Sequence, residues 1–199
     1  MSDLAARTCT AFRDDAHLAS GPLADVALAV KAALEAAPAA SILVFDDATG
    51  RVVDLDLRGT AAEIAARLAA PTGPADQPGA APAERGRGRP KLGVVAREVT
   101  LLPRHWEWLS AQPGGASQAL RRLVEDARRN DGGRSRARQA QEAAYAFISA
   151  MAGNREGFEE ASRALFAGDA AGFADRSQSW PADIRAHAAR LAADAFTQG

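Results

Sequence analysis

The sequence predicts an α+β fold that is mainly helical, and three observations support this prediction. Alanine supplies much of the apolar fraction and aromatic residues make up only 6% of the 199 residues, which favours helices packed through small side chains. Beyond Gly133, apolar residues recur at helical spacing. Before residue 70, short strand-like runs alternate with helical ones. We therefore expect strands to be a minority.

Residues 1–70 predict a small α+β unit. Thr8 to Phe12 is expected to form a short strand, and Ser20-Gly21-Pro22 is typical of a helix entry, with the serine as cap and the proline in the first turn. The helix that follows ends before Pro38. Its apolar residues stand at helical spacing: Leu23, Val26, Ala27, Val30 and Leu34.

A hairpin and a short helix complete this predicted unit. Ile42 to Phe45 and Val52 to Leu57 are strand-like runs, and Asp47-Ala48-Thr49-Gly50 between them has a composition typical of turns. We expect the two runs to pair with each other. Thr60 and Glu63 have the spacing of a capping box at the start of a helix.

The rest of the chain divides into a linker and two helical parts. Residues 71–92 are expected to form a linker, because residues 71–90 hold five of the ten prolines. Residues 93–131 predict a strand from Val94 to Leu102, a helix from Pro103 to Gln112, a turn at Pro113-Gly114-Gly115, and a second helix from Ser117, its expected cap, to about Asn130. Residues 134–199 predict three or four short helices with breaks near Gly153, Gly168 and Trp180-Pro181.

Charge is distributed unevenly along the chain. Residues 1–84 carry 6 basic and 12 acidic side chains, residues 85–138 carry 13 and 5, and residues 139–199 carry 5 and 8. The net charges are therefore −6, +8 and −3, although the whole chain has a net charge of only −1. A concentrated positive block is typical of a phosphate-binding surface, so we expect double-stranded DNA as the partner.

The strand, short helix, glycine turn and longer helix within residues 93–131 resemble the ribbon-helix-helix fold of bacterial repressors. The residues that carry the resemblance are Val99-Thr100-Leu101-Leu102-Pro103, Trp106, Leu109, Gly114-Gly115, Ser117 and Leu120-Arg121-Arg122-Leu123. The resemblance implies a homodimer, in which strands from two chains pair into a ribbon that enters the major groove. It also implies that the start of the second helix, at Ser117, sits on a phosphate.

Which side chains of this strand contact bases is left open by the sequence. Alternate residues of a strand share a face. If Val99 and Leu101 pack inward, Thr100 is the main direct contact with bases; if Thr100 and Leu102 pack inward, Arg97 takes that role. Neither face offers a strong set of base-contacting side chains.

The basic run before this segment resembles an AT-hook. Its core is Arg87-Gly88-Arg89-Pro90-Lys91, preceded by Arg85 and Gly86. The resemblance implies binding in the narrow minor groove of A·T-rich DNA, where glycine avoids a clash and arginines meet an enhanced negative potential. Gly86 stands where hooks usually have a proline. The alternative is a basic linker that charge keeps soluble.

Arginines of the second helix and beyond complete the candidate DNA-binding residues. Arg121 and Arg122 are expected to contact backbone phosphates, and Arg128, Arg129, Arg134, Arg136 and Arg138 are weaker candidates. The alternative is a solvated face on which Arg122 pairs with Asp126, and Glu125 with Arg129, four residues apart. Trp106 and Trp108 point to different faces, so we expect one in the core and the other in a dimer or domain contact.

Catalysis, metal binding and membrane insertion are not expected. Asp46, Asp47, Asp54 and Asp56 are explained by a hairpin turn and an exposed strand, so we expect no enzyme and no cofactor. One cysteine and three scattered histidines offer no zinc spacing or disulfide framework. No signal-like start and no apolar run near the roughly 18 residues of a membrane span are present, so we expect a cytoplasmic protein.

Over its whole length the chain is also similar to a bacterial family described as a domain of unknown function. The entry to the last helix, Trp180-Pro181-Ala182-Asp183-Ile184-Arg185, belongs to this similarity. It implies that the three parts occur together, with dimerisation, sensing and partner binding as open roles for the outer two. The sequence predicts a dimeric DNA-binding regulator or nucleoid-associated protein; the alternative is an antitoxin-like adaptor whose basic block binds an acidic protein.

Overall fold

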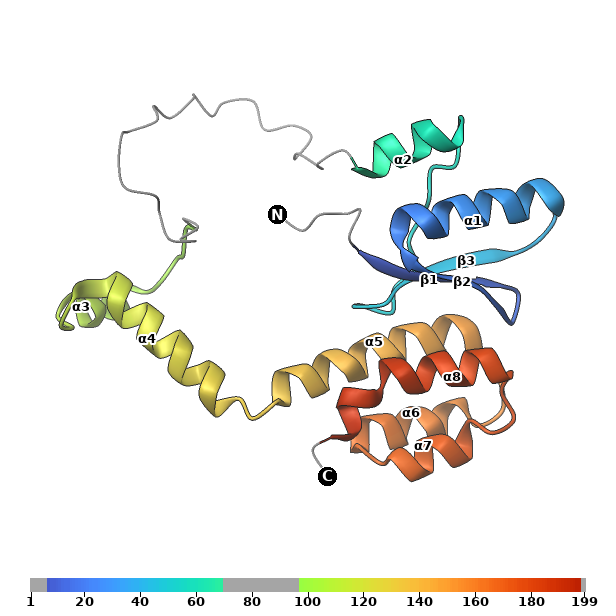
Figure 1. Ribbon diagram of the computed structural model, residues 1–199. Helices are drawn as coiled ribbons and strands as arrows, with labels where there is room; N and C mark the ends of the chain where they lie inside the picture. Colours follow the sequence, from blue (N-terminus) through green and yellow to red (C-terminus); the bar gives the residue numbers. More distant parts are fainter. Residues whose placement is uncertain (1–6, 70–96, 198–199) are drawn as a thin grey trace. The chain divides into compact units, whose positions relative to one another are not determined.

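A computed structural model of the protein describes residues 7–69 and 97–197, which form two compact units. The main unit joins the described residues up to 69 with those from Gly133 on (Figure 1). The hairpin unit consists of residues 97–132. The fold is α+β and mainly helical, as predicted. The predicted linker, residues 71–92, lies outside the described residues.

The main unit contains an antiparallel sheet of β1 (Thr8–Arg13), β2 (Ala16–Pro22) and β3 (Ile42–Asp46), in the order β2-β1-β3. β1 confirms the predicted strand. β2 was not predicted, and it changes the role of Ser20, which pairs with Thr10 in the sheet instead of capping a helix. Pro22 occupies the N-cap position of α1 (Leu23–Ala36), and no side chain caps that end.

The predicted hairpin of Ile42 to Phe45 with Val52 to Leu57 is wrong in its pairing. β3 pairs with β1, and the later run makes only an isolated bridge between Phe45 and Val52. The physical reason is packing, because Val53, Leu55 and Leu57 lie against the apolar cluster beneath α1 without a ladder of hydrogen bonds. The turn between the two runs is present.

The predicted capping box at the start of α2 (Ala61–Ala69) is confirmed. The Thr60 N–H donates to Glu63 Oε2 at 2.7 Å, and the Glu63 N–H donates to Thr60 Oγ1 at 3.3 Å. Ile64 of this helix is buried. A local sequence signal therefore determines the start of α2.

Helices cover both faces of the sheet. Cys9, Ala11 and Val44 belong to a cluster with buried residues of α1, whereas Phe12 and Phe45 belong to a second cluster with α5 (Arg134–Ala152) and α8 (Ala182–Leu191). This division follows from the alternation of side chains along a strand. Figure 1 shows α1 on one side of the sheet and α5 with α8 on the other.

The C-terminal helices share their core with the N-terminal residues. α5 is followed by α6 (Phe158–Ala167), α7 (Ala170–Arg176), α8 and a short 3-10 helix, η2 (Ala193–Phe196), and the helix ends fall at the predicted breaks. The ring of Phe147 lies 5.4 Å from that of Phe12 and 4.9 Å from that of Phe45, between centroids. Residues 1–70 and 134–199, which the sequence analysis separates, thus fold together.

The hairpin unit contains α3 (Pro103–Ser110) and α4 (Gly115–Asn130), as predicted. The predicted strand from Val94 to Leu102 does not form in its described part, residues 97–102. A strand requires a neighbour to complete its hydrogen-bond ladder, and no segment within residues 7–69 and 97–197 supplies one to these residues. Throughout the two described stretches, no helix has both the length and the apolar character needed to cross a membrane.

Candidate nucleic-acid interface

The start of α4 follows a glycine turn after α3, and no side chain caps it. Gly114 and Gly115 both have positive φ, 81° and 74°, which only glycine adopts readily. Ser117 is an exposed residue inside the first turn and does not cap the helix, contrary to the prediction. The reason is that α4 begins two residues earlier, with Gly114 at the N-cap position. The first turn carries no acidic residue, so the partial positive charge of the helix start is not compensated there.

Most apolar side chains of the hairpin unit are exposed. Within residues 97–132, only Leu109 and Ala119 are buried. Trp106 and Trp108 are 39% and 51% exposed, so the expectation that one enters the core is wrong. The other large exposed apolar residues of this unit are Val99, Leu102, Leu123 and Val124. The two short helices are too small to bury them.

An apolar groove runs between α3 and α4. Its volume is about 250 Å³, and its lining residues are Leu101, His105, Trp108, Leu109, Leu120 and Leu123. The lining is almost entirely apolar apart from His105. Exposed apolar surface of this kind is typical of an interaction surface.

The arginines of α4 divide into two pairs. Arg128 forms an ion pair with Glu125 at 3.3 Å, and Arg129 forms one with Asp126. The alternative pairing at four-residue spacing, of Arg122 with Asp126 and of Glu125 with Arg129, therefore does not form. Both acidic side chains bond to the arginine three residues later, which lies on nearly the same helix face.

Arg121 and Arg122 are the two arginines of α4 that do not pair with an acidic residue of this helix. Both are exposed, and neither makes a hydrogen bond or ion pair with the residues that the structure describes. Each of these exposed guanidinium groups can attract an anion, because it can form charge-assisted hydrogen bonds with phosphate oxygens.

The remaining predicted contacts lie before α3. Arg97 and Thr100 are both exposed in a segment that forms no strand. Arg85, Arg87, Gly88, Arg89, Pro90 and Lys91, which carry the AT-hook resemblance, lie outside the described residues. Of the predicted set, the structure thus places Ser117, Arg121 and Arg122 on one helix.

Asp46, the first of the aspartates considered for catalysis, has a structural role. The buried Asp46 carboxylate accepts from the N–H groups of Ala48 at 2.7 Å and Thr49 at 2.9 Å, and it also contacts the guanidinium of Arg7. These bonds shape the turn after β3. Within residues 7–69 and 97–197, no cluster of three or more His, Cys, Asp or Glu side chains could hold a metal ion.

Sequence reasoning missed a polar cluster between the sheet and α8. Asp47 Oδ1 accepts from Thr10 Oγ1 at 2.8 Å and from Arg190 Nη2 at 3.3 Å. The ring nitrogen Nδ1 of buried His187 lies 2.7 Å from Arg190 Nη2. The spacing of His187 and Arg190 on one helix turn was visible in the sequence, but nothing in it indicated that Thr10 and Asp47 lie opposite.

Comparison with known proteins identifies a family that covers most of the chain. A family model described as "Uncharacterized protein conserved in bacteria (DUF2239)" matches residues 8–192. The match covers the predicted linker, the hairpin unit and the main unit up to the end of α8. No curated protein and no solved structure matches the chain.

Proposed function

The chain belongs to the bacterial family DUF2239, and we propose that it is a homodimeric DNA-binding protein whose hairpin unit contacts the duplex. The family description gives no activity, so the proposal depends on the residues of this chain. The observation that carries it is that Arg121 and Arg122 are exposed and have no ion pair among the described residues. No side chain caps the start of the helix on which they lie.

Dimerisation is supported by the exposed apolar side chains of the hairpin unit. Within residues 97–132 only Leu109 and Ala119 are buried, so the described part of this unit has little apolar core of its own. In a ribbon-helix-helix arrangement, the strand lacking in the single chain pairs with its copy, and the helices of two chains share one core. Residues 97–102 and the groove between α3 and α4 suit that arrangement.

Replacing Leu123 with glutamate is expected to shift the protein from dimer to monomer. Leu123 is 43% exposed and lines the groove, so a carboxylate there would be buried without a partner in the dimer. Sedimentation velocity across a concentration series would measure the change. Gln139→Glu, which adds the same charge at an exposed position of α5, should remain dimeric; a monomeric native protein would contradict the proposal.

We assign DNA contact to the start of α4 and to Arg121 and Arg122 on the same helix. Backbone N–H groups at a helix start bind phosphate, and the first turn of α4 has no acidic residue to compete. Arg121 and Arg122 extend this positive surface along the helix. The basic residues Arg85 to Lys91 are assigned to the minor groove of A·T-rich DNA, in the manner of an AT-hook.

The double variant Arg121→Gln/Arg122→Gln is expected to bind duplex DNA about tenfold or more weakly near 0.1 M salt. The slope of log affinity against log salt should fall by about two, because each lost phosphate contact removes about 0.9 from it. Fluorescence anisotropy with A·T-rich and G·C-rich duplexes over a salt series would measure both. The loss should be equal on the two duplexes, because phosphate contacts carry no sequence information.

The matched control is Arg128→Gln/Arg129→Gln, which removes the same charge from arginines already paired with Glu125 and Asp126. It should weaken binding much less. Arg87→Ala/Arg89→Ala should instead remove the preference for the A·T-rich duplex. Weak, unselective binding that none of the variants changes would reject the DNA proposal in favour of an acidic protein partner.

A further inference from the structure

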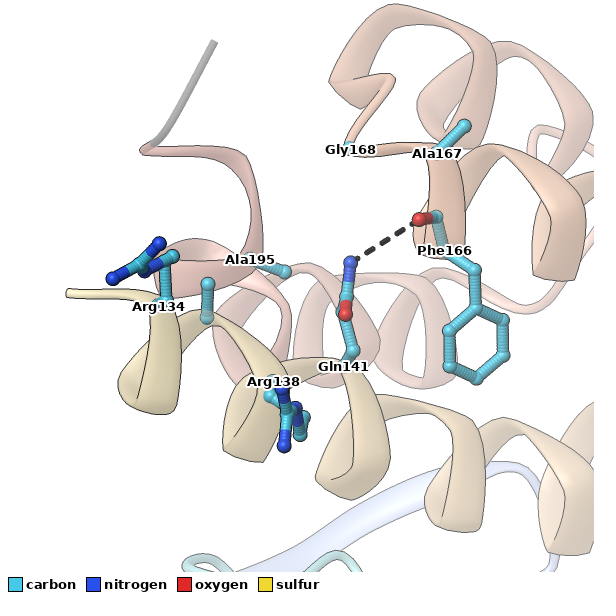
Figure 2. Close-up of a pocket in the computed structure, with 8 residues that line it drawn as sticks. Arg134, Arg138, Gln141, Phe166, Ala167, Gly168 and Ala195 are labelled. Atoms are coloured by element: carbon cyan, nitrogen blue, oxygen red, sulfur yellow. Dashed lines mark hydrogen bonds between the residues drawn. The ribbon is translucent and has the colours of Figure 1, made fainter. Parts of the chain in front are cut away.

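The largest pocket in the described residues lies between the first half of α5 and the end of α6, and its volume is about 380 Å³. Figure 2 shows that the guanidinium groups of Arg134 and Arg138, which both line it, point to different sides. Across from them lie Phe166 and Gly168, and none of the lining side chains is a nucleophile or an acid. This pocket therefore has no group whose chemistry identifies a ligand.

A smaller pocket of the main unit does contain reactive groups. It lies between β2 and α8, and its volume is about 230 Å³. The lining residues are His17, Ser20, Asp183, Ala186, His187 and Arg190. A serine hydroxyl with a histidine as its base is the pair of groups that acyl transfer through a covalent intermediate requires.

Ser20 and His17 lie within hydrogen-bond reach of each other. His17 Nε2 is 2.6 Å from Ser20 Oγ, whereas Thr10 Oγ1 is 3.2 Å from the same oxygen. Thr10 Oγ1 donates its proton to Asp47 Oδ1 at 2.8 Å, so it has no proton to give to Ser20. Because the contact with His17 is the shorter of the two, we assign the Ser20 proton to a hydrogen bond with Nε2 of a neutral imidazole.

Two contacts hold His17 in place. Its ring lies edge-on to the buried ring of Phe12, with 6.0 Å between the centroids. Its backbone N–H donates to Asp183 Oδ2 at 2.8 Å, which ties β2 to the first turn of α8. A base that neighbouring groups orient is the second feature of an activated serine.

Arg190 supplies hydrogen-bond donors to the same pocket. Its three hydrogen bonds all use Nη2, and the partners are Thr10 Oγ1, Asp47 Oδ1 and His187 Nδ1. The N–H groups of Nε and Nη1 therefore have no partner among residues 7–69 and 97–197. Donors of this kind can stabilise the negative charge that develops on the oxygen of an attacked carbonyl group.

We propose that Ser20 is a nucleophile toward small acyl esters, with His17 as its general base. Ser20 Oγ attacks the carbonyl carbon while its proton passes to His17 Nε2. The bond from this carbon to the alcohol oxygen then breaks, and the alcohol leaves with that proton. Water next attacks the acyl group on Ser20 and gives a proton to Nε2, from which Ser20 Oγ recovers it as the acid leaves.

The pocket suits a short acyl chain, because its volume is small and Ala186 contributes a methyl group to its wall. This activity goes beyond the proposed DNA binding and uses no residue of the hairpin unit. It also departs from the expectation, drawn from the sequence, that the chain is not an enzyme.

p-Nitrophenyl acetate is a suitable probe, because it is a small activated ester whose product is coloured. At neutral pH the native protein should release p-nitrophenolate and carry an acetyl group on Ser20, which peptide mass spectrometry would locate. Ser20→Ala should lose both. His17→Gln should lower the rate about 100-fold or more, which is the usual contribution of a general base. Both positions are exposed, and circular dichroism would check that the variants are folded.

The matched controls are Ser179→Ala and His105→Gln, at exposed positions outside this pocket. Both should keep the native rate. No release by the native protein, acetylation only at other residues, equal rates for native protein and Ser20→Ala, or an unchanged rate for His17→Gln would each overturn the proposal. Duplex anisotropy separates the two functions, because Ser20→Ala should retain the DNA affinity that Arg121→Gln/Arg122→Gln loses.

Discussion

Replacing Gly50 with alanine is expected to cost more than about 4 kcal/mol of unfolding free energy, or to prevent folding of the main unit. Gly50 is buried in the turn after β3 and has a φ of +64°. A Cβ atom there would lie 1.8 Å from the carbonyl oxygen of Ala143 in α5. Because the clash is with backbone, no rotation of a side chain relieves it. Urea unfolding followed by circular dichroism would measure the loss.

Gly168→Ala, in the same unit, separates the clash from backbone strain. Gly168 has a similar φ of +72°, but an added Cβ would meet only the Ala195 carbonyl oxygen, at the ordinary contact distance of 3.8 Å. Its cost should be only the roughly 1–2 kcal/mol of a left-handed non-glycine residue. Equal losses of unfolding free energy in the two variants would show that the clash with the Ala143 carbonyl oxygen adds nothing to the cost of Gly50→Ala.

Gly50 also illustrates what the sequence could predict. The run Asp47 to Gly50 has the composition of a turn, and the turn forms. Its contact with Ala143 joins positions 93 residues apart, and no local pattern indicates such a contact. For the same reason the sequence predicted β1, β3, α1 and α2 but divided residues 1–70 from 134–199. Local propensity determines elements, whereas shared cores depend on long-range packing.

The ion pairs of the α4 arginines could not be predicted from the sequence alone either. Residues three and four apart lie on the same helix face, so the sequence alone did not decide whether Asp126 pairs with Arg122 or Arg129. The structure selects Arg129, which leaves Arg122 without an ion pair in the described residues. The pocket containing Arg138 was missed because its far wall, at Phe166 and Ala195, comes from distant helices.

The sequence pattern of Val94 to Leu102 is typical of a strand, and such a strand could pair with a strand from another chain. Val99 and Leu102 are about half exposed in the single chain. A pattern typical of a strand, together with exposed apolar side chains, is expected when the missing partner is a second copy. The dimer proposal therefore explains why the sequence pattern and the single-chain structure differ.

Acidification from pH 6.5 to pH 4 is expected to remove about 3 kcal/mol of unfolding free energy through His187 alone. Burial, followed by the nearby charges of Arg190 and His17, lowers the pKa of His187 from 6.5 to about 4, while Asp47 opposes these effects. Between these two pH values the unfolded chain binds a proton that the folded chain does not. Stability therefore rises with pH across this window and is fully retained above it.

The surroundings of His187 explain why the folded state rejects this proton. The ring packs between Phe12 and Phe147, with centroid distances of 5.4 Å and 4.4 Å. Nδ1 lies 2.7 Å from Arg190 Nη2, which can only donate, so Nδ1 must act as the acceptor. Protonation at Nδ1 would place two donors against each other. Nε2 has no hydrogen-bond partner in the described residues, and its distance of 3.8 Å from Asp47 Oδ1 is too long for one.

His187→Asn should abolish this part of the pH dependence. The asparagine oxygen can still accept from Arg190, so the variant removes the titration while keeping the acceptor. Urea unfolding at intervals between pH 4 and pH 7 would give the slope for each protein. His105→Asn, at an exposed position of α3, should retain the native slope. If His187→Asn retains it as well, the acid sensitivity of the fold arises elsewhere, and the buried imidazole is not its cause.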